Sequence, residues 1–218
     1  MKIPADLAHF KKLRQKLVLE IHDKGITDPG VLNAINTIPR QFFMPPDLAD
    51  KSYEDKAYPI GEGQTISQPY TVAYQTQLLD VQPHHRVLEI GTGSAYQAVI
   101  LALLAFEVFS IERQKRLFEK NKQFGFLKEF SNLYLFYGDG FEGLQQLAPF
   151  DRILITAAAP FVPPKLVEQL KWRGKMVLPL GIEKPQRMAL ITKKENDEIE
   201  EAYFDNFTFV PMLQGKKE

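Results

Sequence analysis

The residues Val87-Leu88-Glu89-Ile90-Gly91-Thr92-Gly93-Ser94 decide the fold class, because they run from a short apolar strand into a glycine-rich turn. Residues 94–104, which follow, are predicted to form a helix. Glycines let the backbone approach a ligand closely, and a helix that starts after them presents free N–H groups. Two glycines also suffice for a plain strand–helix turn, so this motif alone leaves both a ligand site and a simple turn open.

Outward from this turn, apolar strands alternate with helical segments. Strands are predicted at 86–90, 107–112, 133–137, 152–156 and 175–180, and helices at 94–104, 114–124 and 164–170, with a short helix after residue 140. Strands that alternate with helices form parallel β/α units. Residues 187–193 and 202–210 are predicted to pair as a hairpin across the turn 195–198, which gives the sheet an antiparallel edge.

The first part of the chain precedes these units. Apolar residues at positions 7, 10, 13, 17 and 21 predict an amphipathic helix that ends at Gly25, and Asp28 before Pro29 indicates the N-cap of a second helix. Residues 39–69 lack clear periodicity and are predicted to be an ordered functional loop, followed by a helix to about residue 79. We predict one domain over 1–218, with N-terminal helices and a substrate loop in 1–80 and an α/β core in 81–218.

The composition argues against several classes of protein. The chain has 218 residues, with 27 Lys+Arg, 27 Asp+Glu and a pI near 6.9, which argues against a nucleic-acid partner. The absence of Cys, and four His without metal-binding spacing, lead us to expect no metal site. The longest apolar stretch, residues 98–106, is far shorter than the roughly 20 residues that span a bilayer. We expect a monomeric, cytoplasmic protein without a membrane partner.

Acidic residues at the ends of two further strands indicate the ligand. Glu112 ends the second strand, where a carboxylate can bind both hydroxyls of a ribose. Asp139 in Gly138-Asp139-Gly140 follows the third strand, where it can accept from an adenine amino group. Glu112 alone could be a surface carboxylate, and Asp-Gly is a common turn. Because Tyr96 stands where a dinucleotide fingerprint needs a small residue, a pyrophosphate is disfavoured, and S-adenosylmethionine fits the three signals.

Several motifs together resemble the protein-L-isoaspartate O-methyltransferase family over nearly the whole chain. They are Pro39-Arg40 with Phe43, Tyr58–Gly61, Gly63–Pro69, Glu89–Ser94, Gly138–Gly140, Thr156–Pro160 and Phe209–Pro211, and Thr65–Pro69 is the most specific. The resemblance implies the seven-stranded, Rossmann-like α/β sheet of S-adenosylmethionine-dependent methyltransferases, with an N-terminal helical segment and an active-site loop. It implies an enzyme that methylates the free α-carboxylate of L-isoaspartyl residues in damaged proteins and peptides, initiating their repair and releasing S-adenosylhomocysteine.

The resemblance also assigns roles to matched residues. Ser67 matches the active-site serine of the family. The implied cofactor-binding residues are Ile66, Gln68, Glu89, Gly91, Thr92, Gly93, Ser94, Glu112, Asp139 and Gly140, and the implied substrate-binding residues are Ile60, Ala157, Ala158 and Pro160. Two positions depart from the pattern. Ala95 stands where many relatives carry a third glycine, and Leu213 where some carry threonine, so a polar contact is lost there.

The expected chemistry needs little from the protein. A carboxylate has a pKa near 4 and is an anionic nucleophile at neutral pH, so its attack on a sulfonium methyl needs alignment and exclusion of water. Ser67 is therefore expected to orient the substrate carboxylate. It lacks the G-x-S-x-G elbow of serine hydrolases. The alternative is that Ser67 only caps the helix that begins after Pro69.

Two other functions on the same fold stay open at this point. Methyltransferases that act on nitrogen commonly carry Asn/Asp-Pro-Pro-Tyr after the fourth strand, whereas this chain has Thr156–Pro160 with small side chains. A non-catalytic binding protein is the second alternative, since fold does not determine function. The presence of Ser67, Glu112 and Asp139 argues against it.

Overall fold

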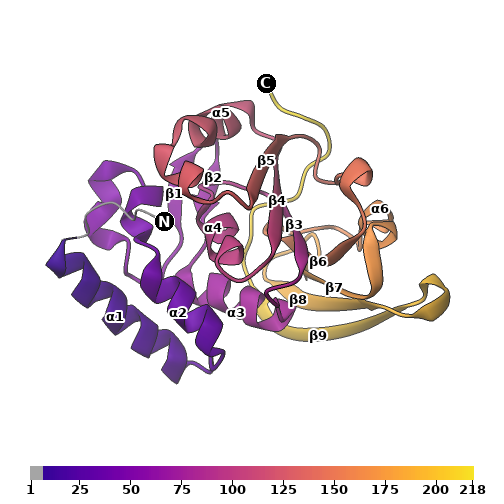
Figure 1. The fold of residues 1–218 in the computed structure, drawn as a ribbon, viewed down its shortest axis with the longest axis horizontal. Helices are drawn as coiled ribbons and strands as arrows, with labels where there is room; N and C mark the ends of the chain where they lie inside the picture. The colour runs from indigo at the N-terminus through magenta and orange to yellow at the C-terminus, as the bar shows by residue number, and fades with distance from the viewer. Residues whose placement is uncertain (1–6) are drawn as a thin grey trace.

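A computed structural model describes residues 7–218 (Figure 1). Within them a seven-stranded sheet has the order β5-β4-β3-β6-β7-β8-β9. Its strands are β3 (Arg86–Ile90), β4 (Glu107–Glu112), β5 (Leu133–Tyr137), β6 (Phe150–Ile155), β7 (Leu170–Leu180), β8 (Gln186–Lys193) and β9 (Ile199–Phe207). The pairs among β3 to β7 are parallel, and β8 and β9 are antiparallel. The predicted seven-stranded α/β sheet is confirmed.

The parallel strands bury alternate side chains on opposite faces of this sheet. Val87, Val108 and Leu154 belong to a buried cluster that also contains residues of the helices on that face. These are α1 (Ala8–Asp23), α2 (Pro29–Thr37), α3 (Pro69–Leu79), α4 (Tyr96–Ala102) and α5 (Lys115–Gln123). Leu88 and Phe109, one position further along, belong to a second cluster. No helix within residues 7–218 has the length and hydropathy to cross a membrane.

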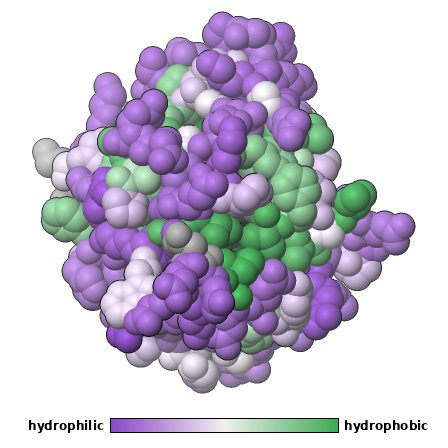
Figure 2. Space-filling view, turned by 90° about the vertical axis from the view of Figure 1, so that its right-hand side faces the viewer, coloured by the Kyte–Doolittle hydropathy of each residue, from purple (hydrophilic) through white to green (hydrophobic). Residues whose placement is uncertain are grey.

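The second face is covered by less helix. Its helical cover consists of α6 (Pro164–Glu168) and the 3-10 helix η4 (Gln145–Leu147), both only a few residues long. Figure 2 views the side of the molecule that carries α6 and the β8–β9 hairpin, and it shows apolar surface gathered near the centre among polar side chains. The predicted short helix after residue 140 is thus a single 3-10 turn.

The N-terminal helices form where the sequence predicts them. Asp28 is the N-cap of α2, and its carboxylate accepts the Val31 N–H at 3.0 Å, with Pro29 in the first turn. α1 ends at Asp23, and Gly25 follows with φ +100°, a conformation that favours glycine. The α1 and α2 helices lie side by side at the left of Figure 1, away from the β8–β9 hairpin.

Residues 39–69 are more regular than predicted. They contain the 3-10 helices η1 (Arg40–Phe43) and η2 (Pro46–Lys51) and a hairpin of β1 (Tyr58–Gly61) and β2 (Gln64–Ile66). The segment was predicted to be an ordered loop, and it is ordered, but it also contains these short elements. The sequence did not reveal the hairpin, because strands of three or four residues are too short to show a period of two. Glu62 and both flanking glycines have positive φ and close the hairpin.

Other bounds shift for local reasons. α4 begins at Tyr96 instead of residue 94, because Gly93 and Ala95 have positive φ and cannot belong to a right-handed helix. β7 begins at Leu170 instead of residue 175. Arg173 within it has φ +61°, outside the β region, and the pairing with β6 shifts register between Phe150 and Arg152. β9 covers Ile199–Phe207 instead of 202–210 after the 3-10 turn η5 (Glu195–Asp197).

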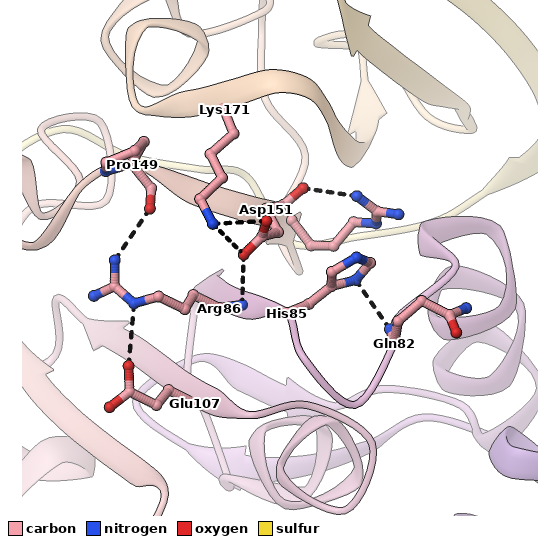
Figure 3. A network of polar contacts seen from close by, with 8 residues as sticks. Gln82, His85, Arg86, Glu107, Pro149, Asp151 and Lys171 are labelled. Carbon is pink, nitrogen blue, oxygen red and sulfur yellow. Dashed lines mark hydrogen bonds and ion pairs between the residues drawn. The ribbon is translucent and has the colours of Figure 1, made fainter.

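A polar network ties together the amino ends of four parallel strands (Figure 3). The Asp151 carboxylate of β6 accepts the Arg86 backbone N–H at 2.8 Å and pairs with Lys171 of β7 at 2.8 Å. The Arg86 side chain donates to Glu107 of β4 at 3.1 Å. His85 Nδ1 accepts the Gln82 N–H at 2.9 Å, and burial lowers the His85 pKa to about 4, so the ring is neutral. The charged side chains of this network therefore link neighbouring strands at their amino ends. A ligand site is to be sought at the carboxyl ends of the same strands.

Candidate active site

An inner cavity lies at the carboxyl ends of β3, β4 and β6. It is lined by the turn 91–94, the end of β4 at Glu112, the loop residues 64–67 and the C-terminal residues 210–213. β3 lies between β4 and β6, so the connections leave its two sides in opposite directions. Open α/β sheets bind ligands at such a switch point, outside the carboxyl ends of the strands. Of the predicted cofactor residues, the lining includes Ile66, Gly91, Thr92, Gly93, Ser94, Glu112 and Gly140.

Close packing explains the first glycine of the turn. Gly91 has φ +98°, and a Cβ placed there would lie 2.6 Å from the Thr156 Oγ1. The Thr156 hydroxyl occupies that space because it lies 2.7 Å from the Gly91 carbonyl oxygen and can donate to it. Gly93 has φ +53°, and Ala95, which follows Ser94, adopts the same left-handed region with φ +68°. Gly91 and Gly93 line the cavity, whereas Ala95 is fully buried behind it.

The Glu112 carboxylate connects β4 to this turn. One oxygen accepts the Gly93 N–H at 2.8 Å and the other accepts the Gln114 N–H at 2.7 Å. The side chain is buried, and burial raises the Glu112 pKa, while the backbone N–H groups act in the opposite direction. Each carboxylate oxygen has a second lone pair, so Glu112 can still accept from two hydroxyls of a ligand.

Glu89 lies behind the turn and does not line the cavity. Strand alternation places its side chain on the opposite face from Ile90, which does line the cavity. Glu89 is fully buried and accepts from the Ser110 hydroxyl, and Ser110 is in turn 2.6 Å from the Thr92 hydroxyl. Burial raises the Glu89 pKa to about 8. Glu89 can therefore support the turn through Ser110 and Thr92, but the structure places no ligand surface on it.

Asp139 is also occupied by the protein. Its two oxygens accept the backbone N–H groups of Phe141 at 2.9 Å and Gly215 at 2.7 Å, which binds the C-terminal segment to this turn. Asp139 is not among the residues that line the cavity, whereas Gly140 is. A Cβ at Gly140 would lie 2.3 Å from an Ile90 methyl group. In the structure, Asp139 therefore links the turn after β5 to the C-terminal segment, next to the cavity residue Gly140.

Ser67 lies where the inner cavity meets a second, outer cavity. Thr65, Ser67, Thr156 and Val210 line both cavities. The outer cavity continues along Gln68, Tyr70, Thr71 and residues 206–209. Among the described residues, no group forms a hydrogen bond with the Ser67 hydroxyl. A side chain here can contact one ligand in the inner cavity and another in the outer cavity.

The structure does not support Ser67 as a helix cap. The N-cap of α3 is Gln68, and its side chain donates to Asp55 at 3.0 Å. The free N–H of Tyr70 is accepted by the same Asp55 carboxylate at 2.8 Å, and Lys24 pairs with it at 2.7 Å. Asp55 therefore satisfies the helix terminus and leaves the Ser67 hydroxyl available.

The predicted substrate residues are divided by the structure. Ala157 lines the inner cavity. Ala158 donates its backbone N–H to Val210 and accepts the Met212 N–H at its C=O, so its N–H is not free for a substrate. Ile60 is buried and lines a separate crevice beside Gly93 and Ser94. Pro160 is exposed and lines none of these cavities.

Sequence reasoning missed several residues of the inner cavity. Thr156 was matched only as part of a motif, although its hydroxyl packs against the glycine turn. Tyr96 was used only to exclude a pyrophosphate, and Arg113 and Gln114 were not singled out, yet all three line the cavity. Arg113 and Gln114 could have been found from the sequence, because they follow Glu112 at the end of a predicted strand. The departure Leu213 also lines the cavity and is half exposed.

The comparisons with known proteins agree with this geometry. A family model described as Protein-L-isoaspartate(D-aspartate) O-methyltransferase matches residues 11–217. The chain belongs to this family. The resemblance of its motifs to the isoaspartate methyltransferases is thereby confirmed, and the match includes both the glycine turn and the loop that carries Ser67.

Individual members of the family match at nearly full length. A protein-L-isoaspartate O-methyltransferase of Flavobacterium johnsoniae is 47% identical over 97% of this chain and 99% of its own. One of Cytophaga hutchinsonii is 49% identical over 93% of this chain and 91% of its own.

Solved structures of the same family share the fold. One protein-L-isoaspartate O-methyltransferase superposes with a TM-score of 0.80 at 27% identity, over 91% of this chain and 65% of that chain. A structure from Plasmodium falciparum described as a protein-L-isoaspartate O-methyltransferase, in complex with S-adenosyl-L-homocysteine, has a TM-score of 0.79 at 25% identity, over 92% and 98% of the two chains.

Proposed function

We propose that this chain transfers the methyl group of S-adenosylmethionine to the free α-carboxylate of L-isoaspartyl residues in damaged proteins and peptides. One observation carries the proposal. The inner cavity, with the glycine turn and Glu112, meets the outer cavity at Ser67 and Thr156. Family membership and the relative bound to S-adenosyl-L-homocysteine support it.

The residues of the inner cavity fit the proposed cofactor. Glu112 offers two buried oxygens with free lone pairs for ribose hydroxyls, and the turn 91–94 offers backbone without bulky side chains. Ile111, Met212 and Leu213 add apolar surface that can pack against a flat base. When bound, S-adenosylmethionine supplies an electrophilic methyl group on a sulfonium sulfur. The chain supplies hydrogen-bond acceptors, orientation and exclusion of water.

The outer side of the site suits an anionic acceptor. A substrate carboxylate is already ionised at neutral pH, so it needs no general base. Among the described residues that line the inner cavity, none is His, Cys or Lys. The Ser67 hydroxyl can donate one hydrogen bond to the carboxylate and hold it in line with the methyl group. Thr65 and Thr156 add hydroxyls at the same junction of the cavities.

The other functions weighed from the sequence have less support. A methyltransferase that acts on a nitrogen atom needs hydrogen-bond acceptors for the amino protons after β6. In this chain the Thr156 hydroxyl there donates to the Gly91 carbonyl, and Ala157 has no polar side chain. A non-catalytic binding protein would have no use for a free hydroxyl between two cavities. Monomeric state, cytoplasmic location, the absence of a nucleic-acid partner and the division of one domain at residue 80 stay predictions.

The test is methyl transfer to a matched pair of peptides. The purified chain is incubated with S-adenosylmethionine labelled in the methyl group and with one peptide in isoaspartyl and in aspartyl form. We expect label only in the isoaspartyl peptide, and we expect base to release it, because the product is an ester. Equal labelling of both peptides, or a base-stable product, would reject the proposed substrate. Peptides with different neighbours should react similarly if the site binds the main chain.

A further inference from the structure

Arg40 is a buried cation that the proposed reaction does not use. Its side chain lies in η1 and has no solvent exposure. Burying a guanidinium is costly unless its N–H groups are satisfied, yet Arg40 Nε and Nη1 have no hydrogen-bond partner among the described residues. Burial lowers the Arg40 pKa only to about 10, so the group keeps its charge at neutral pH. Burial of a charged guanidinium with two unsatisfied nitrogens costs stability, so a functional role for Arg40 is worth considering.

The contacts that Arg40 does make lead to both halves of the site. Its Nη2 donates to the Ser67 carbonyl oxygen at 2.7 Å, across 27 residues of sequence. Its guanidinium carbon lies 4.9 Å from the centre of the Tyr96 ring, at cation–π distance. Tyr96 is the first residue of α4, directly after the glycine turn, and it lines the inner cavity. Arg40 thus bridges the Ser67 peptide and the helix that follows the turn.

Ser67 has few other restraints on this side. β2 ends at Ile66, and the regular structure resumes with α3 at Pro69. Asp55 holds the residues after Ser67 through Gln68 and Tyr70. On the other side of the peptide, the Arg40 hydrogen bond holds the carbonyl of Ser67 itself. With its carbonyl held, Ser67 has a restrained ψ angle, which limits how the Cα–Cβ bond that carries the hydroxyl is oriented relative to this peptide.

We propose that Arg40 is a positioning residue, which sets the Ser67 hydroxyl relative to the turn that holds the cofactor. The proposal rests on the proposed function, because it assumes that Ser67 contacts the substrate carboxylate. Arg40 lines neither cavity, so it acts through Ser67 and not on the substrate. Loss of Arg40 should therefore lower kcat and leave cofactor affinity nearly unchanged, since the Glu112 contacts lie elsewhere.

The first experiment compares Arg40→Lys and Arg40→Met with Arg152→Lys. Arg152 is a matched control, because it is a buried arginine that donates to backbone carbonyls of Leu79 and Asp151 at the far edge of the sheet. Methionine keeps much of the arginine volume without a buried charge, so Arg40→Met should fold even where Arg40→Lys does not. We expect kcat to fall roughly 10- to 100-fold in both Arg40 variants, because misplacement of about 1 Å has effects of that order.

In the same variants the dissociation constant of S-adenosylhomocysteine should change less than about threefold. Arg152→Lys should lower thermal stability and leave kcat unchanged. If kcat of the folded Arg40 variants equals that of the wild type, or if cofactor affinity falls as much as kcat, the positioning role is refuted.

A double-mutant cycle separates this proposal from the proposed role of Ser67. If Arg40 acts through the Ser67 hydroxyl, Arg40→Met should cost almost nothing further in kcat once Ser67→Ala is present. Independent losses that multiply would show that Arg40 acts elsewhere, and would overturn the proposal while the role of Ser67 stands. Wild-type kcat in Ser67→Ala alone would overturn both, and it would be visible in the single variant.

Discussion

The Glu112 carboxylate accepts the Gly93 backbone N–H at 2.8 Å, and this hydrogen bond joins the end of β4 to the glycine turn after β3. The second oxygen accepts the N–H of Gln114 at 2.7 Å, and Gln114 is the N-cap of α5. One buried side chain thus orders the two loops that bound the inner cavity on this side. Its remaining lone pairs can accept from ribose hydroxyls of the proposed cofactor.

Replacing Glu112 should therefore weaken cofactor binding. In Glu112→Gln the amide N–H₂ replaces one of two oxygens that each accept a backbone N–H, from Gly93 or from Gln114. In either orientation one backbone N–H loses its acceptor, and one lone pair is lost to the ribose hydroxyls. Loss of hydrogen bonds of this kind costs about 1.5–3 kcal/mol, and the dissociation constant of S-adenosylhomocysteine should rise roughly 10- to 150-fold in calorimetry. Glu107→Gln, at the amino end of the same strand, is the control and should bind normally. Unchanged binding by Glu112→Gln would contradict the ribose assignment.

Ser67→Ala should slow turnover more than it weakens cofactor binding. The lost hydrogen bond goes to a charged acceptor, so about 1.5–3 kcal/mol is expected, or roughly a 10- to 150-fold decrease in kcat. Ser67→Thr keeps the hydroxyl and should recover part of the activity. Steady-state kinetics with an isoaspartyl peptide measure both variants. A covalent intermediate on Ser67 would instead make it a nucleophile, which the positioning role does not allow.

The buried Glu89 should make stability depend on pH. Its pKa is about 8 in the folded protein against 4.5 for the unperturbed group, so the folded state binds a proton that the unfolded state has released. The stability from this group is complete below pH 4.5 and is lost as the pH rises through 8. Glu89→Gln mimics the protonated form and should remove the effect, which is roughly 2–5 kcal/mol.

Urea unfolding of wild type and Glu89→Gln at pH 6 and pH 9 measures this effect. The wild type should lose stability relative to the variant at the higher pH. Other groups with raised pKa, such as Glu112, are present in both proteins and largely cancel in the difference. Parallel pH profiles for the two proteins would show that Glu89 keeps an ordinary pKa.

Ala95 adopts a left-handed backbone conformation, which is unfavourable in free energy for every residue except glycine. It has φ +68° and is fully buried. In Ala95→Gly the relief of about 1 kcal/mol of backbone strain offsets the lost methyl burial and the larger entropy of the unfolded chain. Stability should stay within about 1 kcal/mol of wild type. Ala98→Gly, equally buried but in regular α4 helix, should lose about 1–2 kcal/mol. Equal losses in thermal unfolding would contradict the strain argument.

Local patterns account for what could be predicted. The bounds of β3, β4 and β5 were predicted to the residue, because each strand is a short apolar run between turn residues. The Asp28 cap was predicted because its hydrogen bond reaches only to Val31. The hairpin β1–β2 was missed, since strands of this length carry no periodic signal. Motif matching selected Ser67 as the candidate active-site serine without reference to any contact that it makes.

Local sequence specifies the order of strands and helices, the glycine turn and the acidic strand ends, because each of these features depends on neighbouring residues. Tertiary packing, in contrast, determined which acidic side chain faces the cavity. Glu112 does, whereas Glu89 lies behind the turn with Ser110, and Asp139 binds the C-terminal segment at Gly215. It also decided that Arg40 meets Ser67. Those contacts join residues far apart in the chain, and their geometry depends on how the sheet, the loop and the C-terminal segment pack together.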